Sequence, residues 1–301
     1  MKKILFLILI LLIASGAGIL VWSSSLAPDG SHDYEIVATE EPVDIQSNAD
    51  TFESDSTSDS VAAPIPTAEP TPEPTAEPVP EGLFPAGINK GKYEQETEIY
   101  GTQYMEYNVV VPNNSEENMA LIIYLPGDNS NDRVDEIPYQ EFAQHVKDIY
   151  GDDFKFIMLL PCTRFFEWHD GWIAEVLKGL IDKTVEDYSI NPDRIYLTGY
   201  SRGAAGAWQM VEDYGDFFGC LVAVSCGSDI HNYEMFKDVP VWGMSGDAYN
   251  DSHTYGSVIK YYCERINEIG GNAKYTQVEG HDHDTGYAAY TEEVIEWMLA
   301  Q

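Results

Sequence analysis

The chain of 301 residues is strongly acidic, because 51 Asp and Glu residues outnumber 16 Lys and Arg residues and give a formal net charge of −35. Binding to nucleic acid, or to anionic lipid through a basic face, depends on clusters of Lys and Arg, so the composition argues against both. A hydrophobic content of 44%, with 12% aromatic residues, is typical of a globular core and excludes disorder of the whole chain.

Residues 1–22 have the pattern of an export signal. Lys2 and Lys3 precede an uncharged run, rich in Ile and Leu, that extends from Ile4 to Trp22. The run is longer than the usual apolar core of a signal peptide and close to the ~20 residues that span a bilayer as a helix. We expect a signal anchor or a cleaved signal peptide, with the rest of the chain outside the cytoplasm, either anchored at the cell surface or secreted.

Residues 23–82 differ in composition from the rest of the chain. They contain 14 acidic residues and no Lys or Arg, and the sequence Thr-Ala-Glu-Pro occurs at both 67–70 and 75–78. Proline favours extended polyproline II, and the negative charges repel one another. Such a segment buries too little apolar area to offset the entropy of ordering it, so we predict a disordered linker.

Residues 83–301 suit a single α/β domain. Continuous apolar runs, typical of strands buried on both faces, alternate with segments of helical length. The expected strands cover 105–111, 119–125, 154–160, 194–198, 220–225, 239–244 and 273–278, and the expected helices cover 139–150, 172–188, 204–214, 255–269 and 291–299. This alternation predicts a mainly parallel sheet with helices on both faces.

The segment Gly199-Tyr-Ser-Arg-Gly203 matches the pattern G-x-S-x-G between a predicted strand and a predicted helix. A serine nucleophile at this place stands on a sharp strand-to-helix turn, which needs small flanking residues. The following helix then directs backbone N–H groups at developing negative charge. We predict that Ser201 is a nucleophile; the alternative is an ordinary serine in a β–α turn.

The run from Tyr188 to Trp208, which contains this motif, resembles exported α/β-hydrolase esterases. These are the esterases related to polyhydroxybutyrate depolymerases, feruloyl esterases and acetyl xylan esterases, which in turn resemble the hydrolase domain of prolyl oligopeptidase. The likeness covers most of residues 83–301 and includes Trp168 with Trp172 and the segment 239–242. It implies the α/β-hydrolase fold and a Ser–acid–His triad in that chain order.

The acid of such a triad should follow the strand at 239–244, where both Asp247 and Asp251 lie. In the family the acid precedes a helix that ends at a Gly-Gly pair, here Gly270-Gly271. That separation favours Asp251, with an insertion of two residues relative to the family pattern, and leaves Asp247 as the alternate. Each of the two could instead be a solvated turn carboxylate.

The histidine of the triad should follow the last strand. The family places Ala-Tyr several residues beyond it, as at Ala289-Tyr290, which favours His283 and leaves His281 as the alternate. Alternation of His and Asp over residues 281–284 could also chelate a metal. The usual three-ligand scaffold is absent from the sequence, so we expect neither a metal nor a cofactor.

The oxyanion hole should combine two backbone donors. The first is the N–H of Arg202, after the nucleophile, and the second comes from the loop after the strand that ends at Leu125. Relatives usually carry His-Gly in that loop, whereas this chain has Pro126-Gly-Asp128. Proline has no N–H, so the second donor is expected from Gly127 or Asp128.

Three aromatic residues are candidates for substrate binding. Trp168 and Trp172 follow a predicted strand and could rim a pocket, where they would stack on a sugar or an aryl acid, or they could anchor the next helix. Tyr200 stands beside the predicted nucleophile. Four cysteines, Cys162, Cys220, Cys226 and Cys263, form no C-x-x-C pair and are expected to be buried thiols.

The sequence thus predicts a monomeric serine carboxylic-ester hydrolase that acts outside the cytoplasm on a small-molecule or polysaccharide-linked ester. Two alternatives stay open. One is a peptidase of the prolyl-oligopeptidase kind with short peptide substrates. The other is a non-catalytic surface binding protein on a hydrolase scaffold.

Overall fold

The structure, a computed structural model, describes residues 82–127, 137–163, 168 and 171–301. The expected export segment, the expected linker apart from Gly82, and Asp128 lie outside the described residues. Within the described ranges, no helix is both long enough and apolar enough to cross a membrane.

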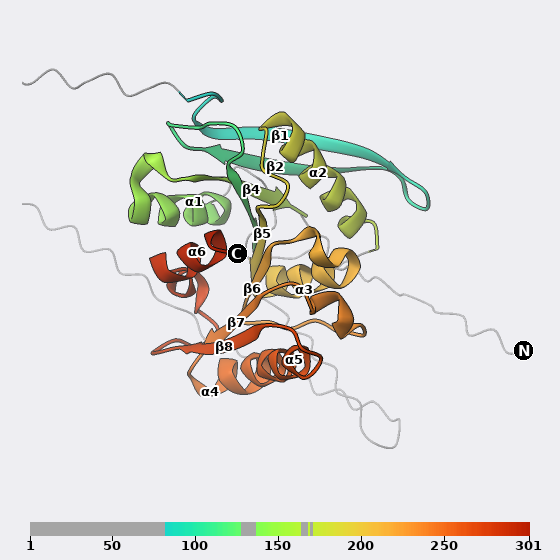
Figure 1. Ribbon diagram of the computed structural model, residues 1–301, viewed down its shortest axis with the longest axis vertical. Helices are drawn as coiled ribbons and strands as arrows, with labels where there is room; N and C mark the ends of the chain where they lie inside the picture. The colour runs from blue at the N-terminus through green and yellow to red at the C-terminus, as the bar shows by residue number, and fades with distance from the viewer. Residues whose placement is uncertain (1–81, 128–136, 164–167, 169–170) are drawn as a thin grey trace, which may run out of the picture. The chain divides into compact units, whose positions relative to one another are not determined.

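The described part of the chain forms one eight-stranded sheet in the order β1-β2-β4-β3-β5-β6-β7-β8 (Figure 1). β1 pairs antiparallel with β2, and β2 with β4, whereas all the other neighbouring strands are parallel. The predicted, mainly parallel sheet is therefore confirmed. Its strands are β1 (Gly87–Thr97), β2 (Gly101–Val111), β3 (Ala120–Leu125), β4 (Phe156–Cys162), β5 (Ile195–Tyr200), β6 (Cys220–Val224), β7 (Val241–Gly246) and β8 (Ala273–Val278).

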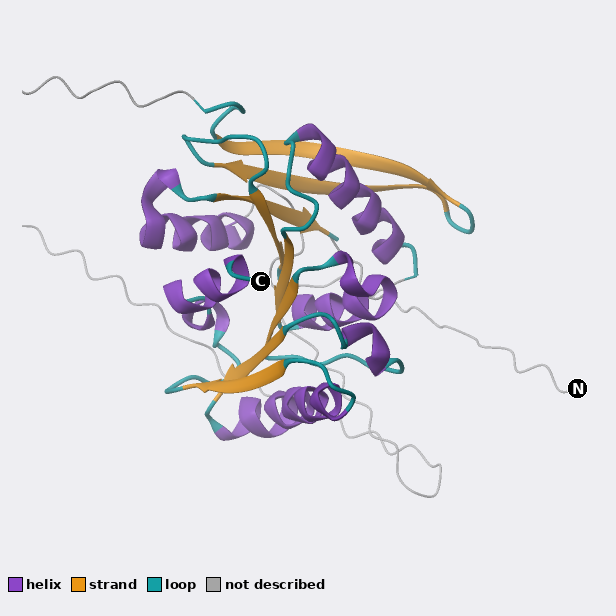
Figure 2. Cartoon of the chain, in the orientation of Figure 1, coloured by secondary structure: helices purple, strands orange, loops and turns teal. Residues whose placement is uncertain are grey.

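Helices cover both faces of the sheet (Figure 2). Helices α2 (Ile173–Asp187), α3 (Arg202–Tyr214) and α5 (Ser257–Glu268) pack on one face, and α1 (Ile137–Tyr150) and α6 (Glu292–Leu299) pack on the other. Single-turn helices lie between them: η2 (Gly151–Asp153), η3 (Gly215–Phe217), η4 (Tyr233–Phe236) and η6 (Gly286–Ala289).

Strand β3 shows why the apolar runs of the sequence are continuous. Leu121 and Ile123 belong to the core under α2, α3 and α5, whereas Ile122 and Tyr124 belong to the core under α1 and α6. Successive side chains of a strand point to opposite faces, so a strand between two helical layers must be apolar at every position.

Strand β1 was not predicted from the sequence. It lies at the edge of the sheet, paired with β2 along its whole length, and its largely polar side chains alternate between half-buried and exposed positions. The strand predicted at 154–160 in fact continues past Pro161, because β4 runs from Phe156 to Cys162. Pro161 pairs with Tyr107 of β2, and the parallel pairing of β4 with β3 already ends at Leu159, so Pro161 lies where the strand has a partner on one side only.

The helix predicted at 255–269 begins earlier in the structure. A short helical turn, α4 (Tyr249–Asp251), comes first, and a π-helical turn, η5 (Ser252–Gly256), joins it to α5. A π-helical turn accommodates additional residues within an otherwise α-helical run. Asp251 itself is the last residue of α4, in the first helical turn after β7.

Candidate active site

The candidate site lies at one edge of the sheet. Strands β5, β6, β7 and β8 are parallel neighbours, so their carboxyl ends meet at the same edge. Ser201 directly follows β5, Ser225 follows β6, Asp251 follows β7 and His283 follows β8. This edge is where open α/β sheets generally bind ligands.

Ser201 stands at the sharp turn between β5 and α3, as the motif predicts. Its φ of +52° is rare for a residue with a side chain. The flanking glycines permit this turn, since a Cβ on Gly203 would collide with the backbone of Leu125, and a Cβ on Gly199 would collide with that of Gly203. The strained backbone holds the hydroxyl in one fixed position above the helix.

His283 is the histidine that the structure brings to Ser201. Its Nε2 atom lies 2.9 Å from Oγ of Ser201. The ring of Tyr255 stacks on the imidazole with 4.7 Å between ring centroids, and the ring of Tyr200 lies 5.7 Å away. The Tyr200 hydroxyl donates a hydrogen bond to the backbone oxygen of His283. The position of His283 is thus set by contacts to both its ring and its backbone.

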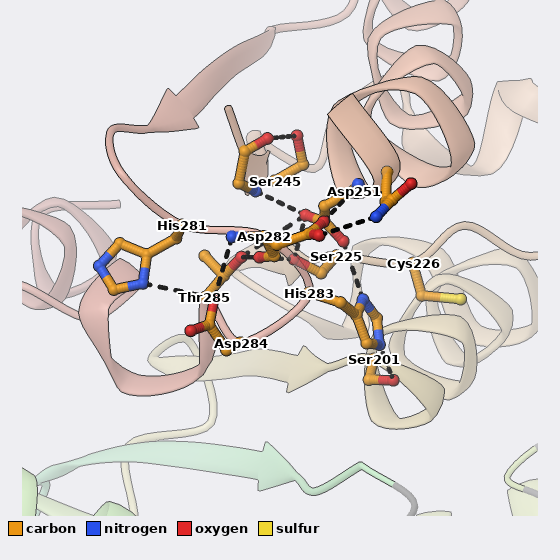
Figure 3. A network of polar contacts seen from close by, with 12 residues as sticks. Ser201, Ser225, Cys226, Ser245, Asp251, His281, Asp282, His283, Asp284 and Thr285 are labelled. Atoms are coloured by element: carbon orange, nitrogen blue, oxygen red, sulfur yellow. Dashed lines mark hydrogen bonds and ion pairs between the residues drawn. The ribbon is translucent and has the colours of Figure 1, made fainter. Parts of the chain in front are cut away.

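Asp251 is the carboxylate that reaches this histidine. Its Oδ1 atom lies 2.8 Å from Nδ1 of His283, and its side chain is 0% exposed (Figure 3). The other oxygen, Oδ2, accepts the backbone N–H of Gly246 at 2.5 Å and the hydroxyl of Ser225 at 2.8 Å. A carboxylate without solvent is costly to bury unless its oxygens are hydrogen-bonded, and here both of them are.

The two alternates, Asp247 and His281, are not part of this chain of contacts. Asp247 is exposed, and its Oδ1 accepts the backbone N–H of Gly280 at 2.9 Å. The imidazole of His281 extends away from Ser201 in Figure 3, and its Nδ1 lies 3.7 Å from an oxygen of Asp284. Their contacts fit the bracing of a loop better than a relay of protons to a serine.

Two residues around the carboxylate were not predicted. The hydroxyl of Ser225 also lies 3.0 Å from that of Thr285, and both residues are fully buried. Ser225 has a φ of +56°, and its N–H donates to the carbonyl of Met244 at 2.8 Å. The sequence does carry one signal for Ser225. This residue ends the apolar run at 220–225, and the end of that predicted strand should lie at the same edge of the sheet as the end of the strand at 239–244, which precedes the predicted acid.

The expected oxyanion donors lie beside the nucleophile where the structure describes them. A Cβ on Gly127 would lie 3.1 Å from Cβ of Ser201, so the loop after β3 runs close to the serine. Arg202 is the first residue of α3, and backbone N–H groups in the first turn of a helix lack acceptors within that helix. Asp128, the other candidate, is outside the described residues.

Trp168 and Trp172 are corrected from substrate-binding candidates to core residues. They are 2% and 8% exposed, so little surface of either residue is accessible for stacking on a ligand. The indole N–H of Trp168 donates to the carbonyl of Pro126 at 3.1 Å, and the ring packs on Gly206, where a Cβ would collide with it. Trp168 therefore supports the loop that carries Gly127.

Tyr200 is half-buried beside the histidine. Burial raises the pKa of its hydroxyl to about 12, and the negative charges of Asp251 and Asp284 act in the same direction. The hydroxyl therefore stays protonated at neutral pH and can act as a donor.

Neither a metal site nor a disulfide is evident in the described ranges. There, no three His, Cys, Asp or Glu side chains are grouped so that they could hold a metal ion. All four cysteines are free thiols; Cys162, Cys220 and Cys263 are buried, as expected, whereas Cys226 is half-buried.

Comparison with known proteins identifies the fold. No family model and no curated protein matches the sequence. Solved structures do match. A thermostable esterase has a TM-score of 0.57 and 21% identity, and the match covers 70% of this chain and 63% of that chain. The esterase 2 of Thermogutta terrifontis phosphorylated by paraoxon has a TM-score of 0.54 and 12% identity, with coverage of 71% and 94%, and a ferulic acid esterase has a TM-score of 0.53 and 11% identity, with coverage of 72% and 99%.

The chain therefore has the α/β-hydrolase fold, as the sequence resemblance implies. It spans less than two thirds of the thermostable esterase, and at these identities the likeness is one of fold. What the site does must consequently be argued from its own residues.

Proposed function

We propose that the chain is a serine carboxylic-ester hydrolase in which Ser201, His283 and Asp251 act as the catalytic triad. The observation that carries the proposal is one continuous chain of contacts, from Oγ of Ser201 to Nε2 of His283 at 2.9 Å and from Nδ1 of His283 to Oδ1 of Asp251 at 2.8 Å. A nucleophile, a base and a group that orients the base in this arrangement support covalent acyl transfer.

The chemistry follows from these positions. Oγ of Ser201 attacks the ester carbonyl carbon while Nε2 of His283 takes the hydroxyl proton, and the imidazolium then gives that proton to the departing alkoxide. Water, activated by the same nitrogen, hydrolyses the resulting acyl-serine. The carboxylate of Asp251 keeps the proton of neutral His283 on Nδ1 and stabilises the imidazolium.

The negative charge that forms on the carbonyl oxygen requires donors fixed in advance. We assign this role to the backbone N–H of Arg202, at the start of α3, and to that of Gly127, whose loop adjoins Ser201. Each such donor typically lowers the barrier by ~3 kcal/mol. Asp128 remains a candidate for the second donor by its place in the sequence.

Hydrolysis of p-nitrophenyl acetate tests this function. Ser201→Ala should abolish turnover, because no other described atom holds the place of Oγ next to His283. Ser257→Ala, which removes an exposed hydroxyl that donates to the carbonyl of His253 in the helical segment, is a matched control and should keep wild-type turnover. Unchanged turnover in Ser201→Ala would contradict the proposal.

For the substrate, we propose an uncharged ester, with acyl groups on polysaccharide as the class to examine first. One of the similar structures is a ferulic acid esterase. The acidic composition also favours a neutral substrate over a polyanion, because like charges repel and would expel the product acid. Comparing kcat/KM on acetylated xylan, methyl ferulate and short-chain esters would distinguish a polysaccharide-directed enzyme from a general esterase.

We propose, further, that the enzyme is monomeric and acts outside the cytoplasm, attached through residues 1–22 or released after their removal. The support for the location is the sequence pattern alone, a basic start and a long apolar run. Fractionation of cells into membrane and medium, followed by mass determination of the mature N-terminus, tests the location.

Two alternative functions have their own tests. Peptidase activity is tested by the same triad variants on aminoacyl-proline amides. A failure of fluorophosphonate to label Ser201 would instead favour a non-catalytic binding protein.

A further inference from the structure

Asp282 stands between the two histidines of its loop, yet its carboxylate contacts neither of them. Its Oδ1 accepts the backbone N–H of Asp251 at 2.8 Å, and its Oδ2 accepts the side-chain amide of Asn250 at 3.0 Å. In Figure 3 this carboxylate lies against the start of the helical segment that carries Asp251, while His283 extends toward Ser201. Asp282, which precedes the proposed base His283 in the chain, thus hydrogen-bonds the backbone of the proposed acid Asp251.

Other contacts between the two loops are made one turn earlier. The N–H of Asp247 donates to the carbonyl of Val278 at 3.1 Å, and the N–H of Ala248 donates to that of His281 at 2.9 Å. Gly246 packs so closely on the carbonyls of residues 281 and 282 that a Cβ would collide with them. These contacts fix the exit of β7, and the two bonds to Asp282 extend the attachment to the helical turn of α4.

The carboxylate of Asp282 is itself firmly placed. Its backbone N–H donates to Oδ1 of Asp284 at 2.9 Å, and its carbonyl accepts the hydroxyl of Thr285 at 2.7 Å. Since the N–H groups in the first turn of a helix have no partner within it, the N–H of Asp251 requires an acceptor from elsewhere. A carboxylate is the strongest acceptor that a side chain offers for such a group.

We propose that Asp282 is a positioning residue that sets the orientation of Asp251 relative to His283. The inference rests on the proposed triad. Because Asp282 and His283 are consecutive in the chain, acid and base share one short connection, and a shift of either loop moves both together. The arrangement also accounts for the acidic residue between two histidines, a pattern that otherwise suggests a metal site.

The test compares three variants of the full-length protein with p-nitrophenyl acetate as substrate. Asp282→Ala removes both acceptors and should lower kcat by about 10- to 100-fold with KM changed less than about threefold, since a misplacement of ~1 Å within a catalytic group costs a rate factor of that order. Asp282→Asn keeps an oxygen that can accept the N–H of Asp251 and should stay within about threefold of wild type. Glu279→Ala removes an exposed carboxylate from the same loop and controls for charge.

The outcomes separate this inference from the proposed function. Wild-type kcat in Asp282→Ala, or an Asn variant as impaired as the Ala variant, would overturn the positioning role. If Asp282→Ala does not fold, Asp282→Glu, which displaces the carboxylate by one methylene, takes its place and must lower kcat. The ¹H resonance of the His283 Nδ1 proton needs no turnover: it should broaden or shift in Asp282→Ala and stay in place in Asp282→Asn, even if Ser201→Ala shows that the proposed function is wrong.

Discussion

Oδ1 of Asp251 lies 2.8 Å from Nδ1 of His283, although the two residues are 32 positions apart in the chain. Parallel pairing of β7 with β8 makes this meeting possible, because the segments after the two strands leave the sheet at the same edge. The contact is local in space and depends on the whole order of the sheet.

The first prediction concerns the identity of the acid. Asp251→Asn replaces the carboxylate with a group of the same shape that cannot stabilise an imidazolium or hold the required tautomer, so kcat should fall by about 10³- to 10⁴-fold. Asp247→Asn, in the exposed turn, should keep kcat within about threefold. Hydrolysis of p-nitrophenyl acetate by the two purified variants decides between them. A larger loss of kcat in Asp247→Asn than in Asp251→Asn would identify Asp247 as the acid.

The second prediction concerns alkaline pH. Burial raises the pKa of Tyr200 to about 12, whereas an unfolded tyrosine ionises near 10. Between these values the folded state holds the proton and the unfolded state has lost it, so the free energy of unfolding must decrease as pH rises from about 10 to 12. The same holds for Tyr262, whose pKa burial also raises to about 12.

Urea unfolding at pH 8 and pH 11 measures this effect. The midpoint should be lower at pH 11, and the loss should be smaller in Tyr200→Phe, which cannot ionise. The Phe variant also lacks the hydroxyl that donates to the carbonyl of His283, so its kcat at pH 8 should fall several-fold while KM changes little. An equal loss of midpoint in both proteins would remove Tyr200 as a source of the alkaline instability.

The third prediction concerns the corrected role of Trp168. Trp168→Phe removes the indole N–H that donates to Pro126 and leaves a smaller ring in a closed space, so the free energy of unfolding should fall by about 2–4 kcal/mol. Because Pro126 precedes Gly127, kcat should also fall, with little change in KM. Denaturant titration and steady-state kinetics check both; a large rise in KM at constant kcat would instead restore a substrate-binding role.

The central strands were predictable because burial on both faces demands uninterrupted apolar sequence, as in β3 and β6. Strand β1 was not, since an edge strand open to solvent needs no such run. The G-x-S-x-G turn was predictable from local sterics alone. The spacing implied by the family resemblance favoured Asp251, but no pattern in the sequence marks the π-helical turn that follows it.

Contacts between residues that follow different strands could not be predicted from the sequence, for a different reason. Ser225 and Asp282 belong to the surroundings of Asp251 only because β6 and the loop after β8 flank it. Ser225 lies in no motif, and the His-Asp alternation around Asp282 indicates chelation rather than a contact with Asp251. Hydroxyl and carboxyl groups of this kind are common at strand ends. Only the strand order tells which of them meet.

The last prediction concerns the buried hydroxyl of Ser225. Ser225→Ala removes a donor to the Asp251 carboxylate and leaves Oδ2 with the N–H of Gly246 as its closest remaining donor. Loss of a hydrogen bond to a buried charged group should lower the free energy of unfolding by about 1.5–3 kcal/mol at neutral pH. With a donor removed, the carboxylate should also hold His283 less firmly, so kcat on p-nitrophenyl acetate should fall several-fold with little change in KM.

The backbone at Ser225 offers a matched control. Its φ of +56° strains alanine and serine alike but not glycine, so Ser225→Gly lacks the hydroxyl while relieving the strain. The Gly variant should therefore be at least as stable as the Ala variant yet show the same fall in kcat. Recovery of the wild-type kcat in Ser225→Gly would mean that the hydroxyl does not act on Asp251, and that the effect of Ser225→Ala comes from the backbone.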